Sequence, residues 1–98
     1  MVAITLADCN VMNDGGEILT TTIITPSTAD STNTIDITDI CADGQLLGIK
    51  SSWDIETGDA VTCTYDVSTG YLLLDNSGAT SNHTYCIVIM IRGSVFTP

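Results

Sequence analysis

The carboxylates are the side chains best suited to chemistry in this chain, and they are not organised into a motif. Twelve Asp and Glu residues are spread along 98 positions that hold one histidine, His83. A glycosidase needs two carboxyl groups at a set separation beside a sugar cleft, and the sequence singles out no such pair. There is no G-x-S-x-G nucleophile elbow, and His83 is predicted to be a solvated loop residue in "SNHT". We therefore predict no catalytic residues and expect a protein that is not an enzyme.

One oxygen-rich stretch, residues 8–17 ("DCNVMNDGGE"), has the composition of a calcium loop. It fails the spacing of an EF-hand, because Met12 stands where an oxygen ligand belongs and Asn13 where the loop glycine belongs. A calcium site assembled from separate loops stays open as an alternative. We predict no metal and no other cofactor, since no Gly-rich phosphate loop is present either.

The chain has four cysteines at wide and unequal spacing: Cys9, Cys41, Cys63 and Cys86. The absence of a C-x-x-C pair argues against zinc. Two disulfides or four free thiols remain as alternatives. The N-terminus lacks the basic start and apolar run of a signal peptide, so a reducing compartment and free structural thiols are favoured.

The overall charge restricts the partners. Only Lys50 and Arg92 oppose the acidic residues, and the formal net charge is −10. Such a surface repels nucleic acid and anionic lipid, and it either keeps the protein soluble or meets a basic partner. The longest apolar run, residues 85–91, falls far short of the ~20 residues that a membrane-spanning helix requires. We expect a soluble protein that contacts neither nucleic acid nor membrane.

The elements that must position these residues are predicted to be strands. Sixteen threonines, with many isoleucines and valines, favour pleated strands over helices. Turn signals recur at short intervals, at residues 13–16, 25–33, 42–44, 57–59, 68–70 and 75–82. This spacing predicts an all-β fold, a single antiparallel β-sandwich or jelly-roll-like barrel of about 6–8 strands that fills one domain over residues 1–98.

Strands are predicted at residues 17–25, 33–40, 46–54 and 84–93, with a hairpin at residues 60–75. In the hairpin, alternation places Val61, Cys63, Tyr65 and Val67 on one face. Gly48 interrupts its strand and is predicted to mark a β-bulge.

The last predicted strand is apolar on both faces. Tyr85, Ile87, Ile89 and Ile91 alternate with a second apolar row, Cys86, Val88 and Met90. A sheet with one face in water would leave the second row exposed, so we expect loops or another subunit to cover it. Residues 94–98 are predicted to form a short C-terminal arm, in which Phe96 either closes the core or anchors the chain in a partner.

Residues 56–93 carry a resemblance to a known group of proteins. They contain "TGDAVT" at 57–62, "YDVSTG" at 65–70 and a final apolar strand that ends in Arg-Gly. In these features, and in size and acidity, the chain resembles the head decoration (cement) proteins of tailed bacteriophages.

The resemblance implies a non-enzymatic virion protein, made in the host cytoplasm, that sits on the capsid exterior, usually as a trimer, and bridges major capsid subunits. The partner-binding residues are then expected to include Val95 and Phe96 as an anchor, Arg92 as a charge-assisted contact to a carboxylate, and Trp53. The alternative is a carbohydrate-binding or adhesin-like β-sandwich of a tail or fibre, with Trp53 and Tyr71 as a platform for sugar.

Overall fold

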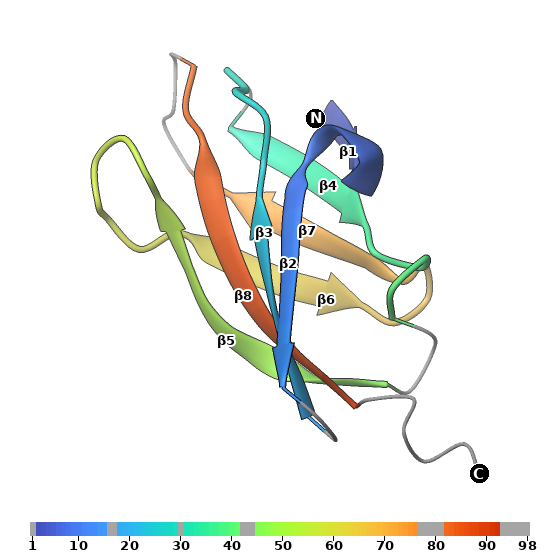
Figure 1. Ribbon diagram of the computed structural model, residues 1–98. Helices are drawn as coiled ribbons and strands as arrows, with labels where there is room; N and C mark the ends of the chain where they lie inside the picture. Colours follow the sequence, from blue (N-terminus) through green and yellow to red (C-terminus); the bar gives the residue numbers. More distant parts are fainter. Residues whose placement is uncertain (1, 16–17, 30, 42–44, 77–81, 93–98) are drawn as a thin grey trace, which may run out of the picture.

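Short strands with alternating apolar and polar side chains pair into two four-stranded sheets that face each other (Figure 1). The computed structural model describes residues 2–15, 18–29, 31–41, 45–76 and 82–92. The predicted fold class is confirmed: the chain is a small β-sandwich with eight strands. The strands are β1 (Val2–Thr5), β2 (Asn10–Gly15), β3 (Ile18–Ile24), β4 (Thr32–Asp36), β5 (Leu46–Asp54), β6 (Thr62–Asp66), β7 (Tyr71–Asp75) and β8 (Tyr85–Arg92), with one 3₁₀ helix, η1 (Leu6–Asp8).

Each sheet draws its strands from both halves of the chain. Sheet A has the order β1-β4-β7-β6, and sheet B has the order β2-β3-β8-β5. All neighbouring strands are antiparallel except β1 and β4, which run parallel. Because β8 lies between β3 and β5, residues near the carboxyl end hold together strands from the first half. No helix in the described ranges has the length and apolar character needed to cross a membrane.

The core lies between the sheets and is built from the inward row of each strand. β8 contributes Tyr85, Ile87, Ile89 and Ile91, all at most 2% exposed, as the alternation predicted. The facing layer comes from sheet A, whose inward residues include Ile35, Leu72 and Leu74 at 0%. A fully buried aliphatic side chain of this size contributes roughly 1.5–3 kcal/mol relative to its exposed state. Burial of apolar surface therefore supplies most of the free energy that holds the two sheets together.

β5 contains two irregularities that bend it. The pairing with β8 shifts register between Leu46 and Gly48 and again between Ile49 and Ser51. Leu47 and Lys50 are the extra residues, and the predicted bulge at Gly48 is confirmed. A bulge sharpens the local twist of a strand. Figure 1 shows the resulting curve of β5 along the edge of sheet B.

Two aspartates end strands of sheet A in the same way. Asp36 Oδ1 accepts hydrogen bonds from the amide and the hydroxyl of Thr38 at 2.9 and 2.6 Å. Asp66 Oδ1 accepts the same pair from Ser68 at 2.9 and 2.7 Å. An aspartate that binds the backbone two residues ahead turns the chain, so the strand predicted at 33–40 stops at Asp36. The predicted face of Val67 is wrong for the same reason: it lies in the turn after Asp66 and is 74% exposed.

The amino-terminal strands were not predicted. Residues 8–15, interpreted as part of an oxygen-rich loop, form the end of η1 and the whole of β2. β2 pairs with β3 from Asn10 to Gly15. Polar residues at an edge strand are free to face water, which hid the strand from an alternation test. Residues 16 and 17, the turn at 42–44, residues 77–81 and the arm at 94–98 lie outside the described ranges.

Candidate functional site

The outward row of β8 runs along the middle of the outer face of sheet B. Cys86, Val88 and Met90 point away from the core, opposite to the inward isoleucines. Their own neighbours cover them in part, because Val88 lies between Thr22 and Ser51 in the register and Cys86 is only 5% exposed. Val88 and Met90 remain half-buried. The described residues of one chain therefore cover this row only in part.

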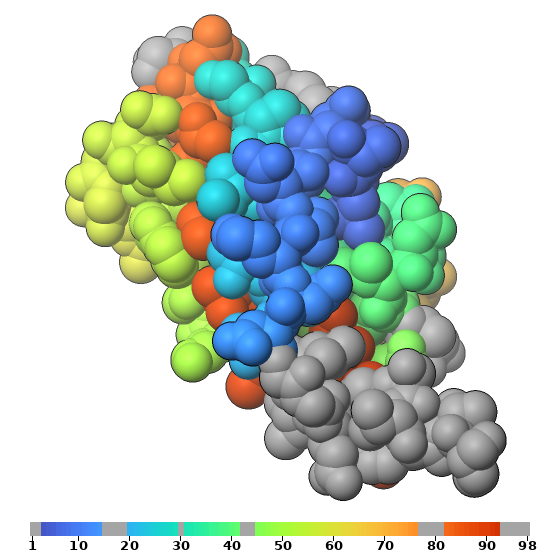
Figure 2. All heavy atoms as spheres, viewed as in Figure 1, coloured from blue at the N-terminus to red at the C-terminus, as the bar shows by residue number. Residues whose placement is uncertain are grey.

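Apolar side chains from all four strands extend this surface across sheet B. We call it the sheet-B face, and its apolar residues are Met12 of β2, Ile24 of β3, Val88 and Met90 of β8, and Leu47 and Trp53 of β5. Met12 and Leu47 are 55% and 50% exposed. Figure 1 shows the four strands of sheet B side by side in front of β6 and β7, and Figure 2 shows the atoms of the molecule in the same view. Thr22 lies between Met12 and Val88 in the register, so polar residues separate some of these apolar side chains. Apolar side chains gathered on one face of a sheet mark a candidate interaction site.

Charges are distributed unequally between the two sheets. Both basic residues belong to sheet B, Lys50 at a bulge of β5 and Arg92 at the end of β8, and both are exposed. The four strands of sheet A, all within the described ranges, contain no Lys or Arg and carry Asp36, Asp66 and Asp75. The sheet-B face is thus where a second acidic molecule can approach with the least repulsion.

The structure does not bring the predicted partner-binding residues together. Trp53 is half-buried and pairs with Cys86 near the start of β8, whereas Arg92 lies at its end. Cys86 and Arg92 are six positions apart along the strand, a span of roughly 20 Å. The amide of Arg92 donates to the carbonyl oxygen of Gln45 at 2.8 Å. Val95 and Phe96 lie outside the described residues.

The proposed sugar platform of Trp53 and Tyr71 is not formed. Trp53 faces outward from sheet B, beside Cys86. Tyr71 faces outward from sheet A, because it alternates with the buried Leu72 of β7. The two rings lie on opposite faces of the sandwich, so one sugar cannot stack on both.

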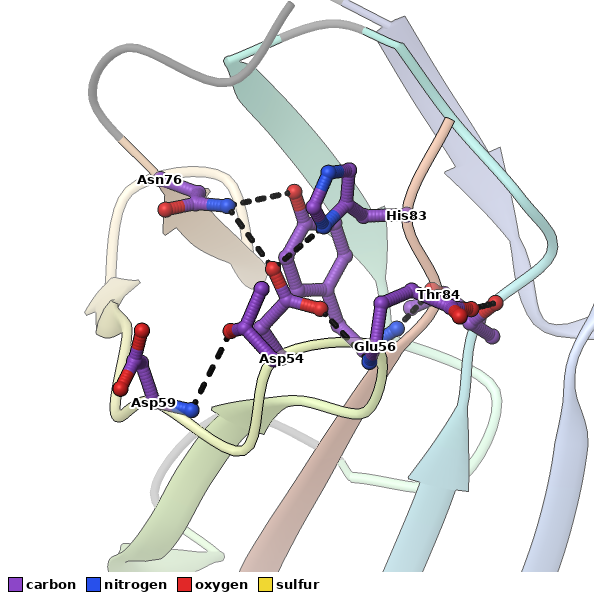
Figure 3. A network of polar contacts seen from close by, with 9 residues as sticks. Asp54, Glu56, Asp59, Asn76, His83 and Thr84 are labelled. Carbon is purple, nitrogen blue, oxygen red and sulfur yellow. Dashed lines mark hydrogen bonds and ion pairs between the residues drawn. The ribbon is translucent and has the colours of Figure 1, made fainter. Parts of the chain in front are cut away.

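A polar network closes one end of the sandwich (Figure 3), and no sequence pattern indicated it. Asp54, 2% exposed, ends β5. Its Oδ1 accepts from the amide of Glu56 at 2.9 Å, and its Oδ2 lies 2.5 Å from Nδ1 of His83 and 3.3 Å from Nδ2 of Asn76. Asn76 also donates to the hydroxyl of Tyr85 at 3.0 Å. One carboxylate therefore joins the ends of β5, β7 and β8.

The environment of Asp54 keeps its carboxylate charged. Burial by itself would raise the pKa of Asp54, but hydrogen bonds from the Glu56 amide and from His83, together with attraction to the His83 ring, bring that pKa below its usual value. A buried polar group is tolerated when its hydrogen bonds are made, and this one makes several. We assign the network a structural role, since it fixes three chain segments at the rim of the core.

His83 is more enclosed than predicted. Its side chain is 17% exposed, and its backbone exchanges two hydrogen bonds with Thr28, at 3.0 and 2.9 Å. The imidazole lies parallel to the ring of Tyr85, with centroids 6.4 Å apart. The prediction of a solvated loop residue is wrong, because a partner 29 positions away in the sequence captures the ring. No local pattern around "SNHT" indicates that partner.

All four cysteines are free thiols, which agrees with the favoured alternative. Cys41 and Cys86 are buried, and Cys9 and Cys63 are half-buried against the core. Burial raises the pKa of the Cys63 thiol to about 11 and raises those of Cys41 and Cys86 as well. Thiols in such surroundings pack as small hydrophobes and react slowly.

Within the described ranges, no group of three or more His, Cys, Asp or Glu side chains is arranged to hold a metal ion. No protein-family model matches the chain, and comparisons with curated proteins and with solved structures found no match. Any assignment of function therefore depends on the residues of this chain and on the sheet-B face in particular.

Proposed function

We propose that this protein is a non-enzymatic structural component of a bacteriophage virion, a decoration protein that binds the capsid exterior and stabilises it by bridging major capsid subunits. The observation that carries the proposal is the sheet-B face, which combines half-buried Val88 and Met90 of β8 with exposed Met12 and Leu47. The resemblance of residues 56–93 to decoration proteins supplies the kind of assembly.

Self-association through the sheet-B face is the first step of this role, and a trimer is favoured by the resemblance. Burying Met12, Val88 and Met90 against another copy removes apolar area from water at roughly 25 cal/mol per Å². Two copies that each carry a charge of −10 repel one another. The repulsion is smallest where carboxylates are fewest, so we expect the contact to lie on sheet B.

Binding to the capsid then depends on many copies. A multimer presents several arms and edges at once, so each individual contact can be weak while the whole attachment is strong. Val95 and Phe96 are proposed as the anchor in this contact, with Arg92 paired to a carboxylate of a neighbour.

Self-association is tested with two matched variants. Met12→Asp adds a charge to the sheet-B face, and Val67→Asp adds the same charge at a 74% exposed residue in the β6–β7 turn. In native mass spectrometry at micromolar concentration, we expect wild type and Val67→Asp to remain oligomeric and Met12→Asp to dissociate. A monomeric wild type, or equal behaviour of the two variants, would remove the sheet-B face from the proposal.

The virion role is tested separately. Protein mass spectrometry of virions purified from a phage that encodes this chain should detect it in a fixed ratio to the major capsid protein. Deletion of residues 94–98 should weaken its retention on capsids while leaving the melting temperature unchanged. A chain missing from washed virions contradicts the capsid assignment, whereas unchanged retention after truncation contradicts only the anchor.

A further inference from the structure

The outer face of sheet A contains a regular arrangement that the assembly role does not use. β4 reads "TNTID" and β6 reads "TCTYD", so each presents two threonines and then an aspartate on its outward side. Both strands pair with β7, which lies between them. The result is three rows across the sheet, Asp36–Tyr71–Asp66, Thr34–Leu73–Thr64 and Thr32–Asp75–Thr62.

The first of these rows holds an aromatic ring between two carboxylates. Tyr71 pairs directly with Asp36 on one side and with Asp66 on the other. Neighbouring strands are ~4.8 Å apart, so the backbones of the two aspartates are roughly 10 Å apart, with the tyrosine midway. Their side chains leave the same face of the sheet as the ring.

Beside this row the surface is hollowed. A depression of about 290 Å³ is lined by residues that include Thr34, Thr64, Asp66, Tyr71 and Leu73. The lining is mostly apolar and includes one charged residue, Asp66. Asp36, which pairs with Tyr71 from the other side, does not line the hollow.

Both carboxylates are ionised and held in place. Hydrogen bonds from the hydroxyl and amide of Thr38 lower the pKa of Asp36, and those from Ser68 lower the pKa of Asp66. In each case the bonds converge on Oδ1. The turn geometry thus fixes the direction of each carboxyl group without help from a cation.

We propose that the Tyr71 hollow binds the guanidinium group of an arginine side chain on a partner protein. A guanidinium is planar, stacks on an aromatic face such as that of Tyr71 and carries donors at its edge that match a carboxylate such as that of Asp66. Charge complementarity selects a cation, because the strands of sheet A carry three aspartates and no Lys or Arg. An arginine matches this geometry better than a lysine, whose ammonium is a point charge.

The inference stands apart from the capsid role, because it concerns the opposite face of the sandwich and a different kind of contact. The probe is N-acetyl-argininamide, and the control ligand is N-acetyl-citrullinamide, which has nearly the same shape and no charge. In ¹H–¹⁵N correlation spectra we expect the arginine compound at millimolar concentration to shift the amide signals of residues 34–36, 64–66 and 71–73 in a saturable way. The citrulline compound should leave them unchanged.

Three variants locate the site. Asp66→Asn should weaken binding about two- to fivefold, the scale of an exposed charge pair, while Asp14→Asn on the sheet-B face makes the same change in net charge and should have no effect. Tyr71→Phe keeps the aromatic face and should bind, whereas Tyr71→Leu should bind more weakly.

Equal shifts with citrulline, an equal effect of Asp14→Asn, or shifts of the same residues with methyl glucoside would overturn the proposal. The comparison of ligands on the wild-type protein decides the matter even if a variant fails to fold. If the arginine compound does not bind, the proposed self-association through the sheet-B face and the virion role are unaffected, because separate experiments test them.

Discussion

Nδ1 of His83 and Oδ2 of Asp54 lie 2.5 Å apart at the rim of the sandwich, although 29 residues separate them in the chain. The pair joins the end of β5 to the segment that leads into β8, and Asn76 adds the end of β7. Stability at this end of the molecule should therefore depend on the charge of one carboxylate.

Acid should weaken the fold partly through Asp54. The pKa of Asp54 is lower in the folded chain than the unfolded value of about 3.9, so its stabilising effect is complete above that value and is lost as the pH falls through the folded pKa. Asp54→Asn lacks this contribution at every pH. We expect its unfolding free energy to lie below that of wild type at neutral pH, with the gap narrowing as the pH falls.

Urea titrations between neutral pH and pH 2 measure this gap. Asp14→Asn is the control, because Asp14 is exposed on β2. If the difference in unfolding free energy between Asp54→Asn and wild type stays constant across the acid range, the ionised Asp54 carboxylate does not stabilise the fold as we expect.

Adjacent residues of β8 should differ sharply in their effect on stability. Ile89 is 0% exposed in the core, and its truncation to alanine should cost about 2–5 kcal/mol because a cavity remains. Val88 points outward and is half-buried, so Val88→Ala should cost less than about 1.5 kcal/mol. Chemical denaturation of both variants, in the same oligomeric state, tests the two-faced arrangement. Similar losses at the two positions would show that the outward row is as buried as the inward one.

Two glycines with the same backbone angle offer a matched test of turn packing. Gly58 and Gly70 both have φ of 78°, where an L-residue is strained by roughly 1–2 kcal/mol. A Cβ at Gly70 would lie 2.8 Å from Cγ2 of Thr38, whereas a Cβ at Gly58 would meet nothing within 4 Å. Gly70→Ala should therefore lower the melting temperature more than Gly58→Ala. Thr38→Ser in the Gly70→Ala background removes the clashing methyl group and should recover part of the loss.

The thiols should be inert in the folded protein. With its pKa raised to about 11, Cys63 holds only about a thousandth of its population as thiolate at pH 8. Iodoacetamide should modify it slowly in buffer and rapidly in denaturant, as followed by mass spectrometry. Because all four cysteines are free thiols, electrophoretic mobility should be the same with and without reductant. A change in mobility on reduction would reveal a disulfide and contradict this prediction.

Much of the fold could be predicted because its signals are local. Alternation over residues 85–91 separates Ile87 and Ile89 from Val88, and the structure places them on opposite sides as expected. Gly48 marked a bulge by its lack of a side chain in an apolar strand. Each of these signals depends on a residue and its near neighbours, since strand geometry repeats every two residues.

The errors fall where a distant partner or a side-chain cap overrides the local pattern. His83 was predicted to be a loop residue, but its ring contacts Asp54, which is distant in the sequence. Val67 continued the predicted alternation, but the strand ends at Asp66, whose carboxylate accepts a hydrogen bond from the Ser68 amide. β2 escaped detection because it is an edge strand with exposed polar side chains. Its backbone pairs with β3, but no repeating apolar row marks the strand in the sequence.

The sequence alone determined that the chain forms strands, that β8 is apolar on both sides, and that the surface is strongly acidic. The tertiary structure decided which strands are neighbours. It put Trp53 and Tyr71 on opposite faces, gathered the basic residues on sheet B, and placed Tyr71 between two aspartates that lie 30 positions apart in the chain. The physical reason is that pairing between strands far apart in sequence is chosen by burial of the whole core, and no single segment contains that information.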